Sequence, residues 1–392
     1  MALEPGSARK GGLGGEERYR ALASTDPCRG EPCGNFTLPG KGLVRLSGPV
    51  KVARLHGQRD LRIEEVEDVP LQAGEVRVNI EAALTCGTDL KVWRRGYHAR
   101  MLTPPCRFGH EFAGRISEVG PGVTDWSVGD RVVAANSAPC GGCPACRRGQ
   151  EQLCADLLFL NGAYGESLVI PERIVRRNLL RLKPTTDFRT AALTEPLACV
   201  VLGLDELQVN PGDRVLVIGS GPIGVMAAVL AQVGGAEATL VGRGAERLTA
   251  ARRMGISQVI DLGTGDVETA VRSAEPGATF DAVFEAVGKP ETWAAATRLV
   301  RPGGRVNWFG GCPANTTVTV DTGLIHYSSL TLRASFHHTP RTIRRALDLL
   351  ESGVLPIAEW VTAEASLDEL PAVFQRMDSG SSALKTLIRP RG

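Results

Sequence analysis

Arg214-Val215-Leu216-Val217-Ile218-Gly219-Ser220-Gly221-Pro222-Ile223-Gly224 is an almost wholly apolar segment that ends in a glycine-rich loop, and a helical pattern follows at 225–233. A G-x-G-x-x-G loop between a strand and a helix lets a pyrophosphate approach the backbone N–H groups at the positive end of the helix. The segment therefore predicts a dinucleotide-binding loop built on Gly219, Gly221 and Gly224.

Strands and helices alternate after this loop, which is typical of a doubly wound parallel sheet in the α/β class. The expected strands lie at 238–241, 258–261, 280–287, 305–309 and 330–336, and the expected helices at 246–254 and 290–300. We therefore assign residues 196–336 to a Rossmann domain.

The end of the second strand of this sheet indicates which cofactor binds. A dinucleotide fold that prefers NAD places an Asp or Glu there to hold the ribose 2′-OH. This chain instead has Val241-Gly242-Arg243-Gly244, with no acid to repel a 2′-phosphate and an arginine to pair with one. We expect a preference for NADP(H) over NAD(H); the alternative is a solvated Arg243 and mixed selectivity. The expected cofactor-binding residues are Gly219, Gly221, Ile223, Gly224, Gly242, Arg243 and Arg247.

The regions on both sides of this domain have a different pattern, with short strands and turn residues. Upstream, the expected strands lie at 50–55, 61–65, 74–80, 114–119, 130–134, 166–171 and 174–176, followed by a helix at 190–204. Downstream, a helix at 341–352 and short strands at 360–363 and 384–388 resume the mixed pattern. We therefore predict that residues 46–195 and 337–392 form one β-rich domain.

Four cysteines form a compact motif inside the upstream region, Cys140-Gly-Gly-Cys143-Pro-Ala-Cys146, with Cys154 following after seven residues. Two overlapping C-x-x-C steps and a fourth thiol close behind match a closed tetrahedral zinc site. The alternatives are a disulfide pair and an iron–sulfur cluster, and we favour structural zinc in a cytoplasmic chain.

A second candidate metal site combines Cys86 with the consecutive residues His110 and Glu111. A thiolate, an imidazole and a carboxylate would leave a fourth zinc position open for water or substrate, as in a catalytic site. The alternative is a buried thiol beside a polar turn. Glu195 heads an otherwise apolar helix, where its carboxylate needs a partner or a metal, unless it is a surface residue of the first turn.

Composition limits the kinds of partner. Lys and Arg number 45 against 43 Asp and Glu, so a net charge of +2 gives no broad field for nucleic acid or an anionic membrane. No apolar run is long enough to span a bilayer, and the N-terminus lacks the apolar stretch of a signal peptide. We expect a cytoplasmic protein with a small-molecule substrate and no nucleic-acid or membrane partner. Residues 1–45 are rich in Gly, Pro and charge, which predicts a disordered extension in which Cys28 and Cys33 are exposed thiols rather than a metal knuckle.

Taken together and in this order, five motifs resemble the zinc-dependent medium-chain dehydrogenases, in particular the sorbitol (L-iditol) and threonine dehydrogenase branch: Cys86-Gly87-Thr88-Asp89, Gly109-His110-Glu111, the Cys140–Cys154 lobe, Glu195-Pro196 and the Gly219 loop. The resemblance covers about residues 50–392. It implies a GroES-like catalytic domain split in sequence around the Rossmann domain, with the active site in the cleft between them.

The resemblance also assigns roles. It implies that Cys86, His110 and Glu111 bind a catalytic zinc, and that Glu195 lies close enough to ligate it directly or through water. It implies that Cys140, Cys143, Cys146 and Cys154 bind a structural zinc, which gives two zinc ions per chain. We also expect a homo-oligomer, either a dimer or a tetramer.

Proton removal is where the chain departs from this family. Thr88 is placed to carry the proton of the substrate hydroxyl towards solvent, but five residues past the cysteine the family usually has a histidine, and this chain has Lys91. Either Lys91, with a pKa lowered by partial burial and the metal, ends the relay, or the proton leaves through water and the cofactor ribose.

The ligand types favour a class of substrate. A carboxylate is a harder ligand than a second thiolate, which favours a vicinal diol, a polyol or a hydroxy amino acid over ethanol. The leading hypothesis is an NADP(H)-preferring polyol or secondary-alcohol dehydrogenase. One alternative is an L-threonine 3-dehydrogenase, in which Arg94, Arg95 or Arg100 would hold the carboxylate unless they form a solvated loop face. A non-catalytic nucleotide-binding protein on the same fold is a further alternative, against which the intact ligand set argues.

Overall fold

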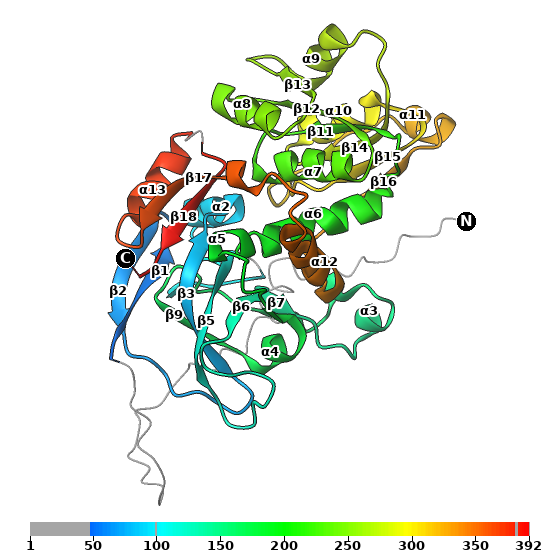
Figure 1. The fold of residues 1–392 in the computed structure, drawn as a ribbon. Coiled ribbons are helices and arrows are strands. Elements are labelled where there is room, and N and C mark those ends of the chain that lie inside the picture. The colour runs from blue at the N-terminus through cyan, green and yellow to red at the C-terminus, as the bar shows by residue number, and fades with distance from the viewer. Residues whose placement is uncertain (1–47, 99, 381–382, 392) are drawn as a thin grey trace, which may run out of the picture.

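The computed structural model describes residues 48–98, 100–380 and 383–391, and it contains two main sheets with helices between and around them (Figure 1). The predicted extension at 1–45, with Cys28 and Cys33, lies outside the described residues. Among the described residues, no helix is both long enough and apolar enough to cross a membrane.

The first sheet has six parallel strands in the order β13-β12-β11-β14-β15-β16, the strand order of a doubly wound dinucleotide-binding fold. Strands and helices alternate as predicted, and their bounds are β11 Arg214–Ile218, α7 Pro222–Val233, β12 Glu237–Gly242, α8 Ala245–Arg253, β13 Gln258–Asp261, α9 Val267–Ala274, β14 Phe280–Glu285, α10 Pro290–Leu299, β15 Val300–Trp308, α11 Thr322–Tyr327 and β16 Thr331–Arg333. Ile218 pairs with Val241 on one side and with Glu285 on the other. The loops after β11, β12 and β14 therefore meet at one edge of the sheet.

The second region is built around a seven-stranded sheet whose strands are antiparallel except for the parallel pair β17–β18. Its upstream elements are β1 Val50–Gly57, β2 Asp60–Val66, β3 Val76–Leu84, α2 Gly87–Arg95, β4 Cys106–Arg107, β5 Phe112–Val119, β6 Arg131–Ala134, β7 Ser137–Ala138, α3 Pro144–Arg147, η1 Glu151–Leu153, β8 Leu158–Phe159, β9 Ser167–Ile170, α4 Glu172–Asn178, β10 Leu179–Arg181 and α5 Phe188–Ala191. Strand β3 pairs with β5, β9 and β18, so it forms the centre of the sheet.

The C-terminal segment completes this second sheet. Its elements are α12 Pro340–Glu351, η2 Ile357–Glu359, β17 Val361–Ser366, α13 Leu370–Asp378 and β18 Lys385–Arg389. Strand β18 lies antiparallel to β3, with Leu387 opposite Leu84. The last described strand thus lies beside the end of β3, two residues before Cys86.

Helix α6 (Thr194–Leu207) lies between the two sheets and packs against α12 (Figure 1). It is apolar along most of its length, and Leu197, Val200 and Leu204 are buried. One apolar cluster reaches through α6 from Leu84 in the second sheet to Phe284 in the first. The two parts of the chain therefore share a core around α6.

One predicted strand is wrong. Residues 174–176, expected to form a strand, lie in helix α4, which follows Pro171 and is supported by an ion pair of 3.5 Å between Glu172 and Arg176. The β-branched pair Ile174-Val175 favoured a strand, but both side chains are buried within the helix, so tertiary packing outweighs local propensity. The predicted domain limits, 46–195 with 337–392 and 196–336, remain a prediction.

Candidate active site

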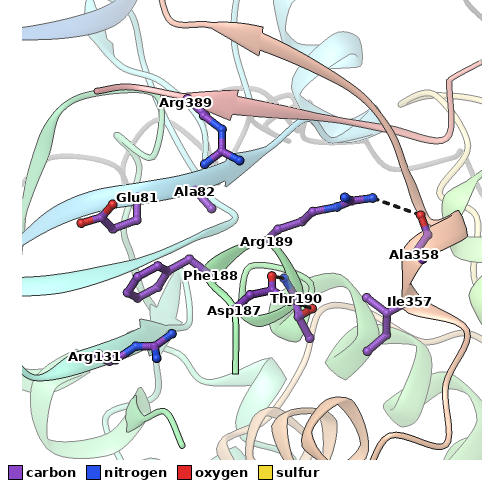
Figure 2. A pocket seen from close by; sticks show the side chains of 10 residues that line it. All are labelled: Glu81, Ala82, Arg131, Asp187, Phe188, Arg189, Thr190, Ile357, Ala358 and Arg389. Atoms are coloured by element: carbon purple, nitrogen blue, oxygen red, sulfur yellow. Dashed lines mark hydrogen bonds between the residues drawn. The ribbon is translucent and has the colours of Figure 1, made fainter. Parts of the chain in front are cut away.

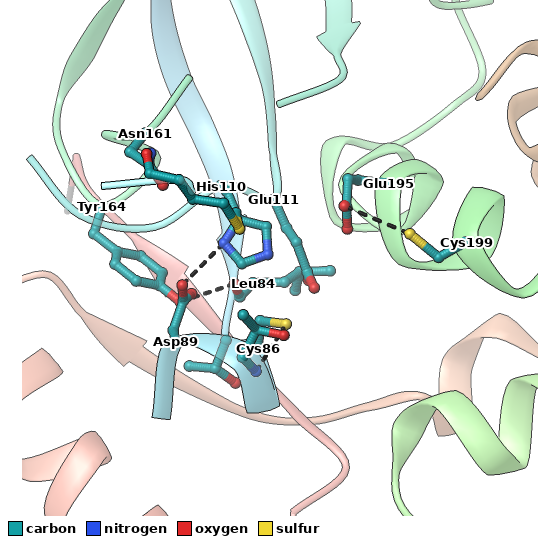
Figure 3. A network of polar contacts seen from close by, with 12 residues as sticks. Leu84, Cys86, Asp89, His110, Glu111, Asn161, Tyr164, Glu195 and Cys199 are labelled. Carbon is teal, nitrogen blue, oxygen red and sulfur yellow. Dashed lines mark hydrogen bonds and ion pairs between the residues drawn. The ribbon is translucent and has the colours of Figure 1, made fainter. Parts of the chain in front are cut away.

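The three donors of the predicted catalytic site converge, with their ligand atoms within 4.8 Å of one another (Figure 3). Cys86 is the N-cap of α2, and its Sγ accepts a hydrogen bond of 3.4 Å from the N–H of Thr88. His110 and Glu111 lie just before β5. Gly109 precedes them with a φ of 88°, and a Cβ there would lie 2.5 Å from the Tyr164 ring. Only glycine therefore allows the chain to pass Tyr164 and present both side chains to Cys86.

A buried chain of hydrogen bonds orients His110. Its Nδ1 lies 2.9 Å from Asp89 Oδ1, and the hydroxyl of Tyr164 donates to Asp89 Oδ2 at 2.7 Å (Figure 3). Burial opposes a charge on His110, but the Asp89 carboxylate and the Cys86 thiol outweigh it and raise its pKa well above the ordinary value. With Nδ1 occupied, Nε2 is the nitrogen that remains for a metal, which is the usual carboxylate–histidine arrangement of metal sites.

Glu111 has a partner that the sequence did not predict. Lys385, at the start of β18, donates to Glu111 Oε1 at 2.7 Å and to the carbonyl of Thr85 at 3.0 Å. The side chains of Lys385 and Glu111 are 2% and 0% exposed, so this is a fully buried ion pair. Burial alone would lower the pKa of Lys385, but the Glu111 carboxylate raises it. Glu111 is therefore an anion that both a lysine and a metal would attract.

Glu195 faces this set from α6. It is 6% exposed, so the alternative of a surface residue is wrong. Burial raises the pKa of its carboxyl to about 7, with smaller effects from His110 and Glu111. It forms a group of possible ligands with Cys199 and His337, whereas Cys86, His110 and Glu111 form another. Figure 3 shows Glu195 across the site from His110 and Glu111.

The four-cysteine lobe has the geometry of a closed metal site. Its Sγ–Sγ distances are 3.5 Å for Cys143–Cys146, 3.9 Å for Cys143–Cys154 and 4.0 Å for Cys140–Cys146. Tetrahedral zinc with four thiolates would separate neighbouring sulfurs by about 3.8 Å. The backbone N–H groups of Cys146 and Ala155 lower the pKa of Cys143 to about 6. All eight cysteines of the described residues are free, so the geometry argues against a disulfide pair.

The glycine loop opens into a cavity of 630 Å³ at the edge where β11, β12 and β14 end. Gly224 is required for packing, because a Cβ would lie 1.8 Å from the carbonyl oxygen of Gly219, whereas Gly221 faces open space. Of the residues predicted to bind the cofactor, Gly219, Gly221, Gly242, Arg243 and Arg247 line the cavity, whereas Ile223 and Gly224 do not; their role in binding remains a prediction.

Arg243 is held at the rim of this cavity. Ser220 Oγ donates to its carbonyl at 2.6 Å and accepts from its N–H at 3.0 Å, while its guanidinium donates to the carbonyl of Gly265 at 2.9 Å. The two acids that line the cavity are engaged: Asp266 caps α9, and Glu291 lies 3.7 Å from Lys289. The cavity is therefore lined by the guanidinium groups of Arg243, Arg247 and Arg298, while its two acids have partners.

Comparison with known proteins decides the family. Residues 72–178 match the model of the alcohol dehydrogenase GroES-like domain, and residues 222–352 match that of the zinc-binding dehydrogenase. L-threonine 3-dehydrogenase of Pyrococcus furiosus is 32% identical over 327 residues, which cover 80% of this chain and 91% of that protein. The chain belongs to the zinc-dependent medium-chain dehydrogenase family.

Other members of the family resemble the chain over most of its length. Sorbitol dehydrogenase of Bacillus subtilis is 27% identical over 87% of this chain and 97% of its own length. A structure described as a zinc-binding dehydrogenase of Sinorhizobium meliloti 1021 bound to NADP superposes with a TM-score of 0.80 at 30% identity, covering 88% of this chain and all of that one. Alcohol dehydrogenase TADH of Thermus sp. ATN1 gives a TM-score of 0.76 at 32% identity, covering 86% and 99%.

The two residues predicted to form a proton relay, Thr88 and Lys91, lie on α2. Thr88 is half-buried beside Cys86, whereas Lys91 is exposed rather than partly buried. Burial raises the pKa of the Cys312 thiol, and the charge of Lys91 opposes that rise. Cys312 follows β15, so the charge of Lys91 acts on a residue of the parallel-sheet region.

The three arginines considered for a substrate carboxylate differ in their partners. Arg94 forms an ion pair with Asp378, which removes it from that role. Arg95 forms no ion pair among the described residues and lies in the last turn of α2. The guanidinium of Arg100 lies 5.1 Å from the centre of the Phe336 ring, and Phe336 precedes His337. Of the three, Arg100 is therefore the one in contact with the segment that carries His337.

Three residues of the site were not predicted. Asp89 belongs to the Cys86–Asp89 motif. A carboxylate in the first turn of a helix does not by itself indicate a contact with His110, which is distant in sequence. Tyr164 lies in an irregular segment between β8 and β9. Lys385 had a signal, because a lone lysine among the apolar residues of β18 needs a buried partner. That partner cannot be located from the sequence, because 274 residues separate it from Glu111.

A second cavity, of 530 Å³, lies between α5, η2 and strands of the seven-stranded sheet. Its walls include α5 and η2, and Arg189 donates to the carbonyl of Ala358 at 3.0 Å across it (Figure 2). It shares no lining residue with the metal sets of the described chain or with the glycine loop. We therefore keep the candidate active site at Cys86, His110 and Glu111.

Proposed function

We propose that the protein is an NADP(H)-preferring, zinc-dependent dehydrogenase of polyols or other secondary alcohols. The observation that supports this most directly is the convergence of Cys86, His110 and Glu111 in a chain that also forms a 630 Å³ cavity at its glycine loop. The sorbitol dehydrogenase relatives support the substrate class.

The residues fit a catalytic zinc and a structural zinc. Cys86, His110 and Glu111 supply sulfur, nitrogen and oxygen donors, and His110 keeps Nε2 available because Asp89 holds Nδ1. Cys140, Cys143, Cys146 and Cys154 supply four sulfurs at tetrahedral spacing. We therefore propose two zinc ions per chain. When bound at the first set, zinc acts as a Lewis acid that lowers the pKa of a substrate hydroxyl or polarises a carbonyl.

The chain's own residues orient the reactants and remove the proton. Asp89 and Tyr164 fix the ring of His110, so the open side of the ligand set faces α6 and Glu195. Thr88 lies half-buried one turn below Lys91 on α2, and its hydroxyl is placed to pass the substrate proton towards solvent. Lys91 is the candidate end of this relay, and its charge acts on Cys312 of the parallel-sheet region.

The cofactor preference rests on the rim of the 630 Å³ cavity. Strand β12 ends at Gly242, and Arg243 follows where an NAD-selective fold has an acid. Arg243 and Arg247 both line the cavity and are proposed to bind the 2′-phosphate of NADP(H). The structure of the Sinorhizobium meliloti relative contains NADP, which supports this choice.

L-threonine 3-dehydrogenase is the second candidate function, and Arg100 is the observation that favours it. It has no acidic partner among the described residues and lies over Phe336, beside the wall formed by His337. A guanidinium in this position is suited to a substrate carboxylate. The threonine dehydrogenase relatives at 31–32% identity are consistent with it.

Steady-state rates test both candidates. Sorbitol and related polyols, L-threonine, 2-butanol and ethanol should be assayed with NADP and with NAD. We expect kcat/KM to be highest for a polyol or secondary alcohol with NADP. A clear preference for L-threonine would select the second candidate, and activity with NAD alone would overturn the cofactor assignment.

We also propose a cytoplasmic homo-oligomer, a dimer or a tetramer. Strand β16 is the edge of the parallel sheet and pairs only with β15 among the described strands. Beside it, α11 has no buried residue, and Tyr327 is 87% exposed. An unpaired strand edge and an exposed aromatic residue favour pairing with a second chain. Light scattering after gel filtration should give a mass of two or four chains.

A further inference from the structure

A second group of metal-type donors faces the catalytic set from α6. The ligand atoms of Glu195, Cys199 and His337 lie within 4.8 Å of one another, as do those of the catalytic set. Figure 3 shows Glu195 and Cys199 together on α6, opposite His110 and Glu111. The catalytic assignment uses only Glu195 from this group, so Cys199 and His337 have no role in it.

The three side chains are held in place without a metal. Glu195 and Cys199 are four residues apart on α6, so they project from the same face, with Sγ 3.7 Å from Glu195 Oε1. His337 has a φ of 64°, in the left-handed region, and its Nε2 lies 2.6 Å from Ser137 Oγ. Its ring also packs against Phe159 at 5.4 Å. The group is therefore preorganised rather than gathered by chance from flexible side chains.

No lysine or arginine of the described residues contacts this group. His338 Nε2 is the only basic atom within 4 Å of the Glu195 carboxyl group among the described residues, at 3.8 Å. The side chains of His338 and Glu195 are 1% and 8% exposed. A carboxyl group, a thiol and an imidazole thus meet in a largely buried place, with no lysine or arginine among the described residues to occupy it.

We propose that Glu195, Cys199 and His337 form a second cation site, which binds a thiophilic divalent ion such as Zn²⁺ or Cd²⁺ and inhibits the dehydrogenase when occupied. Oxygen, sulfur and nitrogen are the donor types that zinc accepts, and a thiolate favours it over Mg²⁺ or Ca²⁺. On binding, Cys199 loses its proton to solvent and Sγ bonds to the ion; no electron is transferred.

Inhibition follows from the position of Glu195. A cation in the second site takes the carboxylate that faces the catalytic set, and it adds positive charge on the side from which the substrate oxygen approaches. This part of the proposal rests on the proposed function, because only an active dehydrogenase can be inhibited. Binding of the ion does not depend on that function.

Binding is tested on the full chain with its resident zinc, by titration with Cd²⁺ and measurement of the ultraviolet absorption of the thiolate–cadmium bond. The wild type should gain one thiolate–cadmium signal that Cys199→Ala lacks, while the resident zinc content, measured by metal analysis, stays equal in both. Cys312→Ala is the matched control, because Cys312 is a free thiol outside every donor group of the described chain. Cys28 and Cys33 contribute equally to all three proteins and cancel in the difference.

Inhibition is tested by adding Zn²⁺ to the turnover assay. The zinc concentration for half-inhibition should rise at least about tenfold in Cys199→Ala, since even the loss of an outer partner costs roughly 10–100-fold in metal affinity. His337→Asn is the second variant, because Asn tolerates a positive φ but lacks the imidazole. It should shift the inhibition in the same direction, and it keeps the test decisive if Cys199→Ala does not fold.

Two results would overturn the proposal: an unchanged cadmium signal in both variants, or zinc inhibition as strong in both as in the wild type. If no substrate is turned over, the proposed dehydrogenase function fails, and the cadmium titration still decides whether the cation site exists.

Discussion

Lys385→Met removes the charge that the structure places against Glu111, and it distinguishes a structural carboxylate from a zinc ligand. Methionine keeps an unbranched chain in the buried space of the lysine but provides no cation. Lys385 and Glu111 are 2% and 0% exposed, with an Nζ–Oε1 distance of 2.7 Å. Breaking such a buried pair leaves an uncompensated charge and costs about 3–5 kcal/mol.

The magnitude depends on whether another cation reaches Glu111. If zinc is bound beside it, the ion neutralises the carboxylate, and the loss of Lys385 should cost less. Without the catalytic zinc, the full penalty should appear. The Cys86→Ser variant provides the second condition, because it weakens the catalytic site and leaves the four-cysteine site intact. We expect the cost of Lys385→Met to be about 1–3 kcal/mol larger in the Cys86→Ser background, the range of coupling between residues in contact.

The assay is a double-mutant cycle in urea unfolding, followed by the same optical signal for wild type, both single variants and the double variant. Lys51→Met is the control, since Lys51 forms an exposed pair with Asp368 at 3.2 Å and should cost at most about 1 kcal/mol in either background. An equal cost of Lys385→Met with and without Cys86 would show that Glu111 does not contact the metal, and it would refute the assignment of Glu111 as a ligand.

Three further predictions concern the metal, the cofactor and the relay. Purified protein should contain two zinc ions per chain, and Cys143→Ser should lower the melting temperature while Cys86→Ser abolishes turnover; one zinc with full turnover of Cys86→Ser contradicts this. Arg243→Ala should raise the KM for NADP at least about tenfold, roughly 1.4 kcal/mol, and leave NAD little changed, with Arg253→Ala as an exposed control. Lys91→Ala should lower kcat for alcohol oxidation, most below neutral pH, and Lys91→His should retain more activity; an unchanged kcat from about pH 6 to 9 would make Lys91 a surface charge.

The parallel sheet could be predicted from local sequence because each of its rules acts over a few residues. The apolar strand at 214–218, the glycines at 219, 221 and 224 and the helix after them are contiguous, and their packing requires only neighbouring strands. The four-cysteine lobe was predictable for the same reason. Helix α4 was mispredicted because Ile174 and Val175 favour a strand locally, and only burial against the rest of the domain makes them helical.

The surroundings of the catalytic set could not be predicted, because they come from distant parts of the chain. The motifs and the family resemblance identified Cys86, His110 and Glu111. Neither the motifs nor the resemblance shows which cation pairs with Glu111. Lys385 approaches it only because β18 pairs with β3 across the whole Rossmann domain. His337 likewise reaches Glu195 from the loop after β16. These contacts depend on the packing of segments that are distant in sequence, and no local sequence pattern predicts that packing.

The possible ligands of the site differ in how far other groups already engage them. Cys86 is the N-cap of α2, and its Sγ accepts a hydrogen bond of 3.4 Å from the N–H of Thr88. His110 is fixed by Asp89. Glu111 is already paired with Lys385, and burial raises the pKa of the Glu195 carboxyl to about 7. The thiolate and the imidazole should therefore provide most of the zinc affinity, while the carboxylates can release the ion's coordination positions to substrate oxygens as they bind.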